Sequence, residues 1–208
     1  MRRKKEDSAQ TRLRILTAAR DVFARRGVAR TTQEHIAAEA GVSRGAIYWH
    51  FANKTELFFA MRDQVSIPLM DRADLALLGP DTADPLASVQ RFLVGMVDAV
   101  ANDAVTRQTL EIMFFKCEYV DDFEVVLKAQ RAHYVELCAK LTQVYEQAFS
   151  VGLLRANISP RQAALGTAVF LVGLIRMWLV DQDGTLVRES TNELIAEHVA
   201  AYRSNALA

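Results

Sequence analysis

The stretch GVSRGAIYWHFANKTEL, from Gly41 to Leu57, decides the fold of this 208-residue chain. Gly41 suits a left-handed turn, and Ser43 is the kind of residue that caps a following helix. The helix expected after Ser43 carries three ring-bearing residues in a row, Tyr48-Trp49-His50. Because a helix turns about 100° per residue, these three rings cannot all enter one core.

Helical phase predicts which of these side chains face outward. With Ile47 placed inward, Phe51 falls on the same side, and Gly45 and Trp49 fall on the opposite side. An exposed tryptophan and a helix-weakening glycine are a poor choice for a plain surface helix. A helix that lies against DNA explains both, because Gly45 lets the backbone approach base edges and Tyr48 offers a hydroxyl to phosphate. The spacing of the whole stretch is that of a helix-turn-helix.

Neighbouring residues extend this candidate DNA-binding surface. Arg44 stands at the N-terminal edge of the helix, and Lys54 lies in the first turn of the next one, where free amides suit a phosphate. Arg30, Thr31 and Thr32 open the preceding helix, although capping explains the threonines without DNA, and either threonine could be the cap. The predicted DNA-binding residues are Arg30, Thr31, Thr32, Arg44, Gly45, Ala46, Tyr48, Trp49, His50 and Lys54.

Each of these residues also has a structural interpretation. Trp49 could pack between domains, and Arg44 could be a solvated charge. His50 falls close to the buried side, so a structural role and a phosphate contact are equally open. The surface therefore rests on the pattern and not on any single residue.

The charge distribution supports a polyanion partner for the N-terminal part. Residues 1–62 hold 13 Lys or Arg against 6 Asp or Glu, and the rest of the chain holds 12 against 19, although the whole chain is neutral. A positive head on a negative body favours nucleic acid as the partner of the head. Solvated faces of mixed charge are the alternative.

The remaining sequence predicts an all-α fold. It has no sustained alternation of apolar and polar residues, whereas helix punctuation is frequent. Ser159-Pro160-Arg161-Gln162, for example, combines a cap, a proline at the first helical position and a glutamine at the third. Pro68 falls inside the fourth helix, where we expect a kink and, as a hypothesis, a hinge. The nine predicted helices cover about 8–26, the segment after 31–32 up to 40, the segment after 43, 53–78, 85–101, 103–117, 122–150, 160–180 and 187–204.

The apolar run at 163–180 predicts a buried helix and not a membrane span. Arg176 sits inside the run, and Arg161 and Asp181 bound it closely, so a span would place charge in hydrocarbon. This helix is apolar nearly all round, which fits core on one side and a twin subunit on the other. Membrane attachment is therefore not expected.

Neither catalysis nor a metal or cofactor site is predicted. Cys117 and Cys138 lack CxxC spacing and are expected to be reduced thiols of a cytoplasmic protein. The four histidines lack metal-ligand spacing, and no nucleophile–base pair or phosphate-binding glycine loop stands out.

From Arg14 to Leu57, RILTAARDVFARRGVARTTQEHIAAEAGVSRGAIYWHFANKTEL strongly resembles the TetR family of bacterial transcriptional repressors. FFKCEYVDD (114–122) and GLIRMWL (173–179) resemble, more loosely, its drug-efflux (AcrR- and TtgR-like) branch. The resemblance implies an all-α, nine-helix protein with an N-terminal three-helix DNA-binding domain at 1–52. It also implies a helical ligand-binding and dimerisation domain at 53–208, which forms a homodimer through helices 8 and 9.

The same resemblance implies a ligand-responsive repressor. As a dimer it would bind a pseudo-palindromic operator in double-stranded DNA. A small hydrophobic effector (a drug, flavonoid or antibiotic-like molecule) would tilt helix 4 and release the operator of a multidrug efflux operon. The alternatives are a DNA-binding dimer without an effector and, with less support, an α-helical enzyme.

A permissive effector pocket is expected in the C-terminal part. Methionine and aromatic side chains can repack around different shapes, although each could equally be plain core. Glu111 and Arg176 are the polar candidates, and either they pair or one of them orients the ligand. Some efflux repressors resembling this chain carry a polar group where it has Val172. The predicted ligand-binding residues are Phe92, Leu93, Met96, Glu111, Met113, Phe114, Val169, Phe170, Val172 and Arg176.

Overall fold

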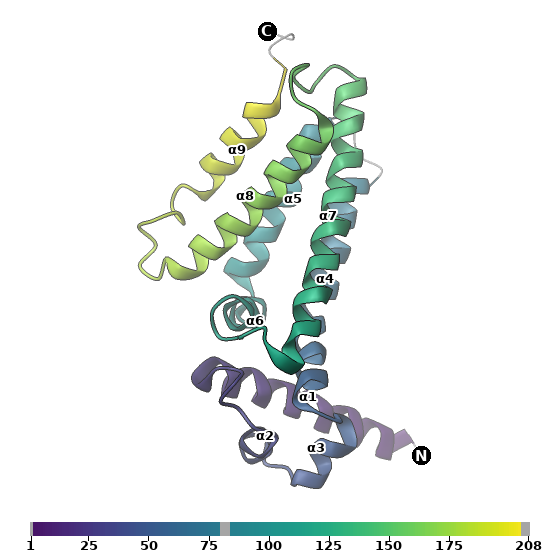
Figure 1. Cartoon of the computed structure of the whole chain (residues 1–208), viewed down its shortest axis with the longest axis vertical. Helices are drawn as coiled ribbons and strands as arrows, with labels where there is room; N and C mark the ends of the chain where they lie inside the picture. Colours follow the sequence, from purple (N-terminus) through teal and green to yellow (C-terminus); the bar gives the residue numbers. More distant parts are fainter. Residues whose placement is uncertain (1, 80–83, 205–208) are drawn as a thin grey trace. The chain divides into compact units, whose positions relative to one another are not determined.

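The computed structural model describes residues 2–79 and 84–204, with side chains from residue 6 onward. Its regular elements are α1 (Arg2–Arg26), α2 (Gln33–Ala40), α3 (Arg44–His50), α4 (Lys54–Leu78), α5 (Pro85–Asn102), α6 (Ala104–Phe115), the 3-10 turn η1 (Asp121–Phe123), α7 (Glu124–Ser150), α8 (Pro160–Val180) and α9 (Thr191–Tyr202) (Figure 1). Within these ranges there is no sheet, only one isolated antiparallel bridge between Leu154 and Arg203. The all-α prediction is confirmed.

The chain forms two compact units. The N-terminal unit holds the residues up to Ile67 together with Ala104–Lys128, and the C-terminal unit holds Pro68–Asp103 together with the residues from Ala129 onward. α4 continues through Pro68, and the division between the units falls immediately before this proline. Because proline has no N–H, the helix loses one backbone hydrogen bond at this point. The hinge role of Pro68 stays a prediction.

Two helix starts differ from the predicted ones. α1 begins at Arg2 and not near residue 8, because residues 2–7 are mostly good helix formers with no stop signal among them. α9 begins at Thr191 and not at 187, because the preceding residues are held in a turn by the carboxylate of Asp181.

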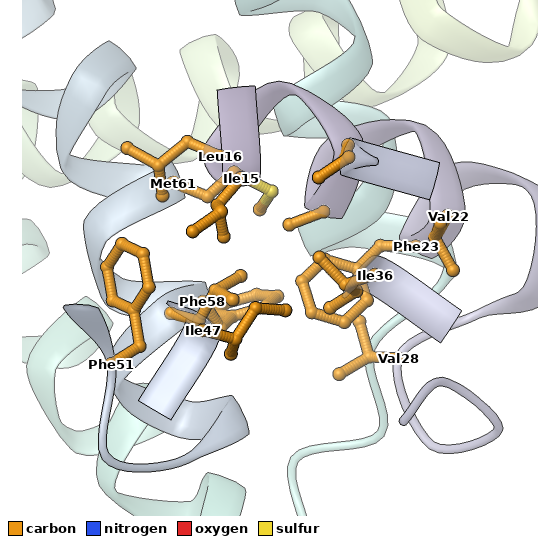
Figure 2. Packing of buried hydrophobic residues seen from close by; sticks show 14 of the residues in the cluster. Ile15, Leu16, Val22, Phe23, Val28, Ile36, Ile47, Phe51, Phe58 and Met61 are labelled. Carbon is orange, nitrogen blue, oxygen red and sulfur yellow. The ribbon is translucent and has the colours of Figure 1, made fainter. Parts of the chain in front are cut away.

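The core of the N-terminal unit gathers apolar side chains from its helices around two phenylalanines (Figure 2). Phe23 and Phe58 pack edge to face with ring centroids 5.8 Å apart, and Phe58 meets Phe123 in the same manner at 5.4 Å. Such pairs add to the stabilisation that apolar burial provides. The labelled members of the cluster are Ile15, Leu16, Val22, Phe23, Val28, Ile36, Ile47, Phe51, Phe58 and Met61.

A buried arginine ties α1 to α4 and α6 inside this unit. Arg20 is 5% exposed, its Nε donates to Thr109 Oγ1 at 3.2 Å, and its Nη2 donates to Gln64 Oε1 at 2.9 Å. Gln108 of α6 also donates to Asp21 of α1 at 3.3 Å. A buried guanidinium needs such partners, because an unpaired buried charge is costly.

Thr109→Val is expected to lower the free energy of unfolding by about 1–3 kcal/mol, since it leaves the Arg20 Nε without this acceptor while keeping the side-chain shape. Urea unfolding measures the change. Thr17→Val, at an exposed position of α1, is the matched control and should stay within about 0.5 kcal/mol of the parent. Equal stability of the Thr109 and Thr17 variants would mean that the hydrogen bond contributes nothing.

In the C-terminal unit, a chain of hydrogen bonds joins α7, α8 and α9. Tyr145 Oη lies 2.7 Å from Thr167 Oγ1, which lies 3.0 Å from His198 Nε2. Burial lowers the pKa of His198 to about 4, so its imidazole is neutral at physiological pH. Phe170 stacks on this imidazole with ring centroids 4.0 Å apart. α8 and α9 lie side by side as a result (Figure 1).

α8 is the described helix that is long and apolar enough to cross a membrane by length and composition alone. Half of its most apolar window is nevertheless buried within the chain. Its buried face includes Leu171, Leu174 and Trp178, as expected of a core helix.

The turn between α8 and α9 is closed by one carboxylate. Asp181 is 3% exposed, and its oxygens accept backbone N–H groups from Leu186 at 3.1 Å and from Val187 and Arg188 at 2.9 Å each. Desolvation raises the pKa of Asp181, but these hydrogen bonds outweigh it and lower the pKa to about 2.

Asp181→Asn is therefore expected to lower the Tm by several degrees at pH 7, because an amide replaces the acceptor-only carboxylate. The folded pKa lies below the unfolded value, so the carboxylate's contribution is complete above about pH 4 and is lost as the pH falls toward 2. Thermal unfolding between pH 7 and pH 3 should show the gap between parent and variant narrowing below about pH 4. Asp98→Asn, at an exposed position, should show no such gap; a gap independent of pH would contradict the assignment.

Candidate functional site

The short helix α3 turns its polar and aromatic face to solvent, as predicted. Trp49 is 82% exposed and Tyr48 is 45% exposed, and Gly45 is exposed as well. On the opposite side, Ile47 and the following Phe51 are sealed in the core. The predicted orientation of α3 is confirmed, and Trp49 is exposed to solvent near the C-terminal end of this short helix.

Local contacts hold α3 in this orientation. Gly41 adopts φ 61°, a left-handed conformation that favours glycine, and ends α2. Ser43 then caps α3 by accepting the N–H of Ala46 at 3.2 Å. Arg14 of α1 donates to the Ala40 carbonyl at 2.6 Å, so α1 braces the turn between the two helices.

Arg44 lies at the edge of the exposed face between two partners. Its Nε is 3.1 Å from Glu34 Oε1, and its guanidinium lies 5.6 Å from the centre of the Tyr48 ring. The Tyr48 hydroxyl, followed by the Glu34 charge, raises the pKa of Arg44. Because both members of the ion pair are largely exposed, the pair is weak, and Arg44 can exchange it for a phosphate or a base edge.

The start of α2 resolves the two threonines. Thr32 is the N-cap and accepts the N–H of His35 at 3.3 Å, while the His35 ring accepts the Thr32 N–H. Thr31 is 1% exposed, and its hydroxyl donates to the Gly27 carbonyl at 2.7 Å. The Thr31 side chain is thus closed inside the turn, which departs from the expectation that it lies on the DNA-facing surface. Thr32 and Arg30 are exposed there.

Lys54 has an internal contact that the sequence did not indicate. Its Nζ donates to the carbonyls of Val28 at 2.9 Å and Ala29 at 3.3 Å, and it lies 5.5 Å from the Phe123 ring. Partial burial lowers the pKa of Lys54. The side chain therefore braces the loop between α1 and α2. In the first turn of α4, the Glu56 N–H donates to Asn53 Oδ1 at 2.8 Å, so the predicted phosphate site is partly capped by the chain itself.

Two further residues near α3 were not predicted. Arg12 of α1 is exposed and lies over the Phe51 ring at 5.1 Å, which brings a cation to the C-terminal end of α3. Gln33 of α2 donates to the Phe51 carbonyl at 3.3 Å. Of the remaining predicted residues, His50 and Ala46 are half-buried. The basic spacing of α1 was the signal that could have identified Arg12.

The predicted ligand-binding residues fall in both units. In the C-terminal unit, Phe92 and Leu93 are buried, and Met96 and Val172 are half-buried. In the N-terminal unit, three residues of α6 are half-buried. They are Glu111, Met113 and Phe114.

Three predicted pocket residues lie on α8 in different surroundings. Val169 is 65% exposed and so does not line the interior of the described chain. Phe170 is occupied by its stack on His198. Arg176 is exposed on α8, whereas Glu111 belongs to the other compact unit, so both alternatives for these charged residues stay open.

The exposed side of α8 is largely apolar, and we call four of its residues the apolar stripe. Leu165, Val169, Met177 and Val180 are each 46–65% exposed, and the exposed Arg176 lies on the same side of the helix. Contiguous exposed apolar residues of this kind mark an interaction surface. No group of three or more potential metal ligands lies together among the described residues.

Comparison with known proteins places this geometry in a family. Residues 15–61 match the model for bacterial regulatory proteins of the tetR family, and residues 84–203 match the C-terminal region of MAATS-type transcriptional repressors. The HTH-type transcriptional regulator TtgR of Pseudomonas putida is 39% identical over 184 residues, which cover 88% of this chain and 87% of TtgR.

Two solved structures extend the likeness over nearly the whole chain. NalD, the secondary repressor of the MexAB-OprM multidrug efflux pump in Pseudomonas aeruginosa, is 28% identical with a TM-score of 0.85, covering 96% of this chain and 99% of NalD. SmeT of Stenotrophomonas maltophilia, solved in complex with triclosan, is 28% identical with a TM-score of 0.79. The match covers 95% of this chain and 93% of SmeT. Family models match both parts of the chain, and the first match contains the helix-turn-helix with its exposed tryptophan. This chain therefore belongs to the TetR family of bacterial regulatory proteins and carries the C-terminal region of a MAATS-type transcriptional repressor.

Proposed function

We propose that this repressor binds a pseudo-palindromic operator as a homodimer, controls a multidrug efflux operon and is released by small hydrophobic effectors. The observation that carries the DNA-binding part is the open Tyr48–Trp49 face of α3 in a segment rich in positive charge. Exposed rings and a glycine suit contact with base edges, and the surrounding cations suit phosphates. We assign DNA binding to residues 1–52 and ligand binding and dimerisation to 53–208.

Contacts to the operator divide into two kinds. The face that enters the groove carries Gly45, Tyr48 and Trp49. Arg44 leaves its ion pair with Glu34 and contacts a base edge or a phosphate. Thr32, Arg30 and the first amides of α4 hold the phosphates on either side. Because phosphate contacts dominate affinity, operator binding should weaken steeply with salt.

The relatives support an efflux operon and a hydrophobic effector. NalD and SmeT are repressors of multidrug efflux pumps, and SmeT is seen with triclosan. The half-buried Met113 and Phe114 of α6 are of the residue types that suit a permissive apolar site. In this role the protein acts in the cytoplasm and has no catalytic activity.

Selection of operators from random DNA, repeated with a panel of hydrophobic drugs at fixed salt, tests the proposal. The expected result is a pseudo-palindrome whose half-sites lie about one helical turn apart, roughly 34–36 Å, and loss of binding with at least one drug. A DNA-binding dimer without an effector is the second candidate. It would select the same operator, but no drug would release it or raise the Tm.

A further inference from the structure

Two polar atoms on successive turns of α4 are buried without a partner. The Arg62 side chain is 7% exposed, and its Nη1 has no hydrogen-bond acceptor in the structure. One turn further, the Ser66 hydroxyl is also buried and has no partner. Positions four apart share one face of a helix, so the two atoms belong to the same side of α4 in the N-terminal unit.

The rest of the Arg62 guanidinium is already bound. Its Nε and Nη2 donate to a single oxygen of Asp63, at 3.0 and 2.6 Å. Its Cζ lies over the Phe59 ring, 4.6 Å from the centroid. One edge and one face are therefore satisfied, and Nη1 remains as an oriented donor.

Burying Arg62 Nη1 and the Ser66 hydroxyl without partners lowers the stability of the folded chain unless a bound molecule supplies acceptors. More than 90% of buried polar groups in proteins have a partner, and each one left without costs about 1–3 kcal/mol. Both atoms are closed off from solvent, so a binding molecule must displace neighbouring side chains, of which the half-buried Phe59 is one. A ligand that supplies acceptors to both donors binds the opened arrangement more tightly than the closed one, and it shifts the population accordingly.

We propose that Arg62 and Ser66 bind the oxyanion of the effector, and that the effector class is a small aromatic carboxylate. This inference rests on the proposed effector-responsive function. The two oxygens of a carboxylate can accept from Arg62 Nη1 and from the Ser66 hydroxyl together, and hydrogen bonds to a charged acceptor are about twice as strong as neutral ones. The Phe59 ring contacts the aromatic body.

Paired probes that differ only in charge test this assignment. 2-Naphthoate carries the carboxylate, and 2-naphthamide is its neutral counterpart of similar shape. Calorimetric titration of the full chain should show naphthoate binding at least about tenfold more tightly than naphthamide. The same titration with Arg62→Met should weaken naphthoate binding about tenfold or more and change naphthamide binding less than about threefold.

Ser66→Ala gives a signature that a structural hydroxyl would not. It removes an unpaired buried hydroxyl, so the Tm of the free protein should stay level or rise, while naphthoate binding weakens about three- to tenfold. Arg72→Met is the matched control, because Arg72 is an exposed arginine of the same helix. It should leave both affinities unchanged. Operator affinity without ligand should be the same in all variants.

Three results overturn the inference. If naphthoate and naphthamide bind equally, or if Ser66→Ala and Arg62→Met bind naphthoate as the parent does, the two donors do not recognise an oxyanion. In either case, release of the operator by a neutral drug would leave the proposed function standing. If neither probe nor any drug binds, the inference and the effector proposal fail together. Should Arg62→Met not fold, Ser66→Ala and Arg62→Lys, which keeps the charge but loses the fork, decide the question.

Discussion

Replacing Trp49 with alanine is expected to lower operator affinity about 10- to 100-fold and to leave the stability of the chain unchanged. The side chain is 82% exposed, so its removal costs the folded state little apolar burial. Against DNA the same ring becomes buried, and one good contact in the groove contributes about 1–3 kcal/mol. Fluorescence anisotropy with the selected operator at fixed salt measures the affinity, and urea unfolding measures the stability.

Two further variants separate DNA contact from folding. Val125→Ala removes an exposed apolar side chain of α7 and should change neither affinity nor stability. Ile47→Ala, on the buried side of α3, should lower the free energy of unfolding by about 2–5 kcal/mol. If Trp49→Ala bound the operator within twofold of the parent, the open face of α3 would not be the DNA-reading surface.

Helical phase and capping explain why α3 could be predicted from the sequence. The distance around the helix from Ile47 to Trp49 depends only on residue spacing, and the caps at Thr32 and Ser43 depend only on near neighbours. For the same reason, each of the nine predicted helices appears in the part of the chain that the structure describes, most of them with the predicted boundaries. Helical phase and capping can be predicted without knowing which helices pack against each other.

Features that depend on distant neighbours were not predictable. Thr31 is closed by the carbonyl of Gly27, and Lys54 is held by the carbonyls of Val28 and Ala29 from another part of the sequence. For Val169 the sequence predicts a pocket position, because an apolar residue on an apolar helix has no signal for which side faces out, whereas the structure leaves it 65% exposed. Tertiary packing decided each of these positions.

The burial of Arg62 is the clearest case of this limit. An arginine on an amphipathic helix is expected at the surface, because arginine is rarely fully buried without a partner. Only the structure shows its side chain enclosed, bound at one edge by Asp63 and open for hydrogen bonding at the other. The candidate anion site therefore depends on tertiary packing, whereas the DNA-binding surface follows from the sequence.

Val169→Glu is expected to convert the protein to a monomer and to lower operator affinity about 100-fold or more. The apolar stripe of α8 is the surface on which we place the second copy, and in a two-fold dimer each substitution occurs twice. Two carboxylates buried in an apolar interface cost several kcal/mol. A monomer binds only one half-site of the operator. It loses the gain in affinity from binding two linked half-sites, which is commonly about 10²- to 10⁴-fold.

Sedimentation at micromolar concentration measures the oligomeric state, and anisotropy measures operator binding in the same buffer. Leu75→Glu is the matched control, because Leu75 is an apolar residue of α4 that is 73% exposed and lies outside the stripe. It should stay dimeric and bind the operator normally. A Val169→Glu chain that remains dimeric would show that the α8 stripe is not the dimer interface. A monomeric variant that still binds the full operator tightly would show instead that one DNA-binding unit suffices. The operator would then not need to be a pseudo-palindrome.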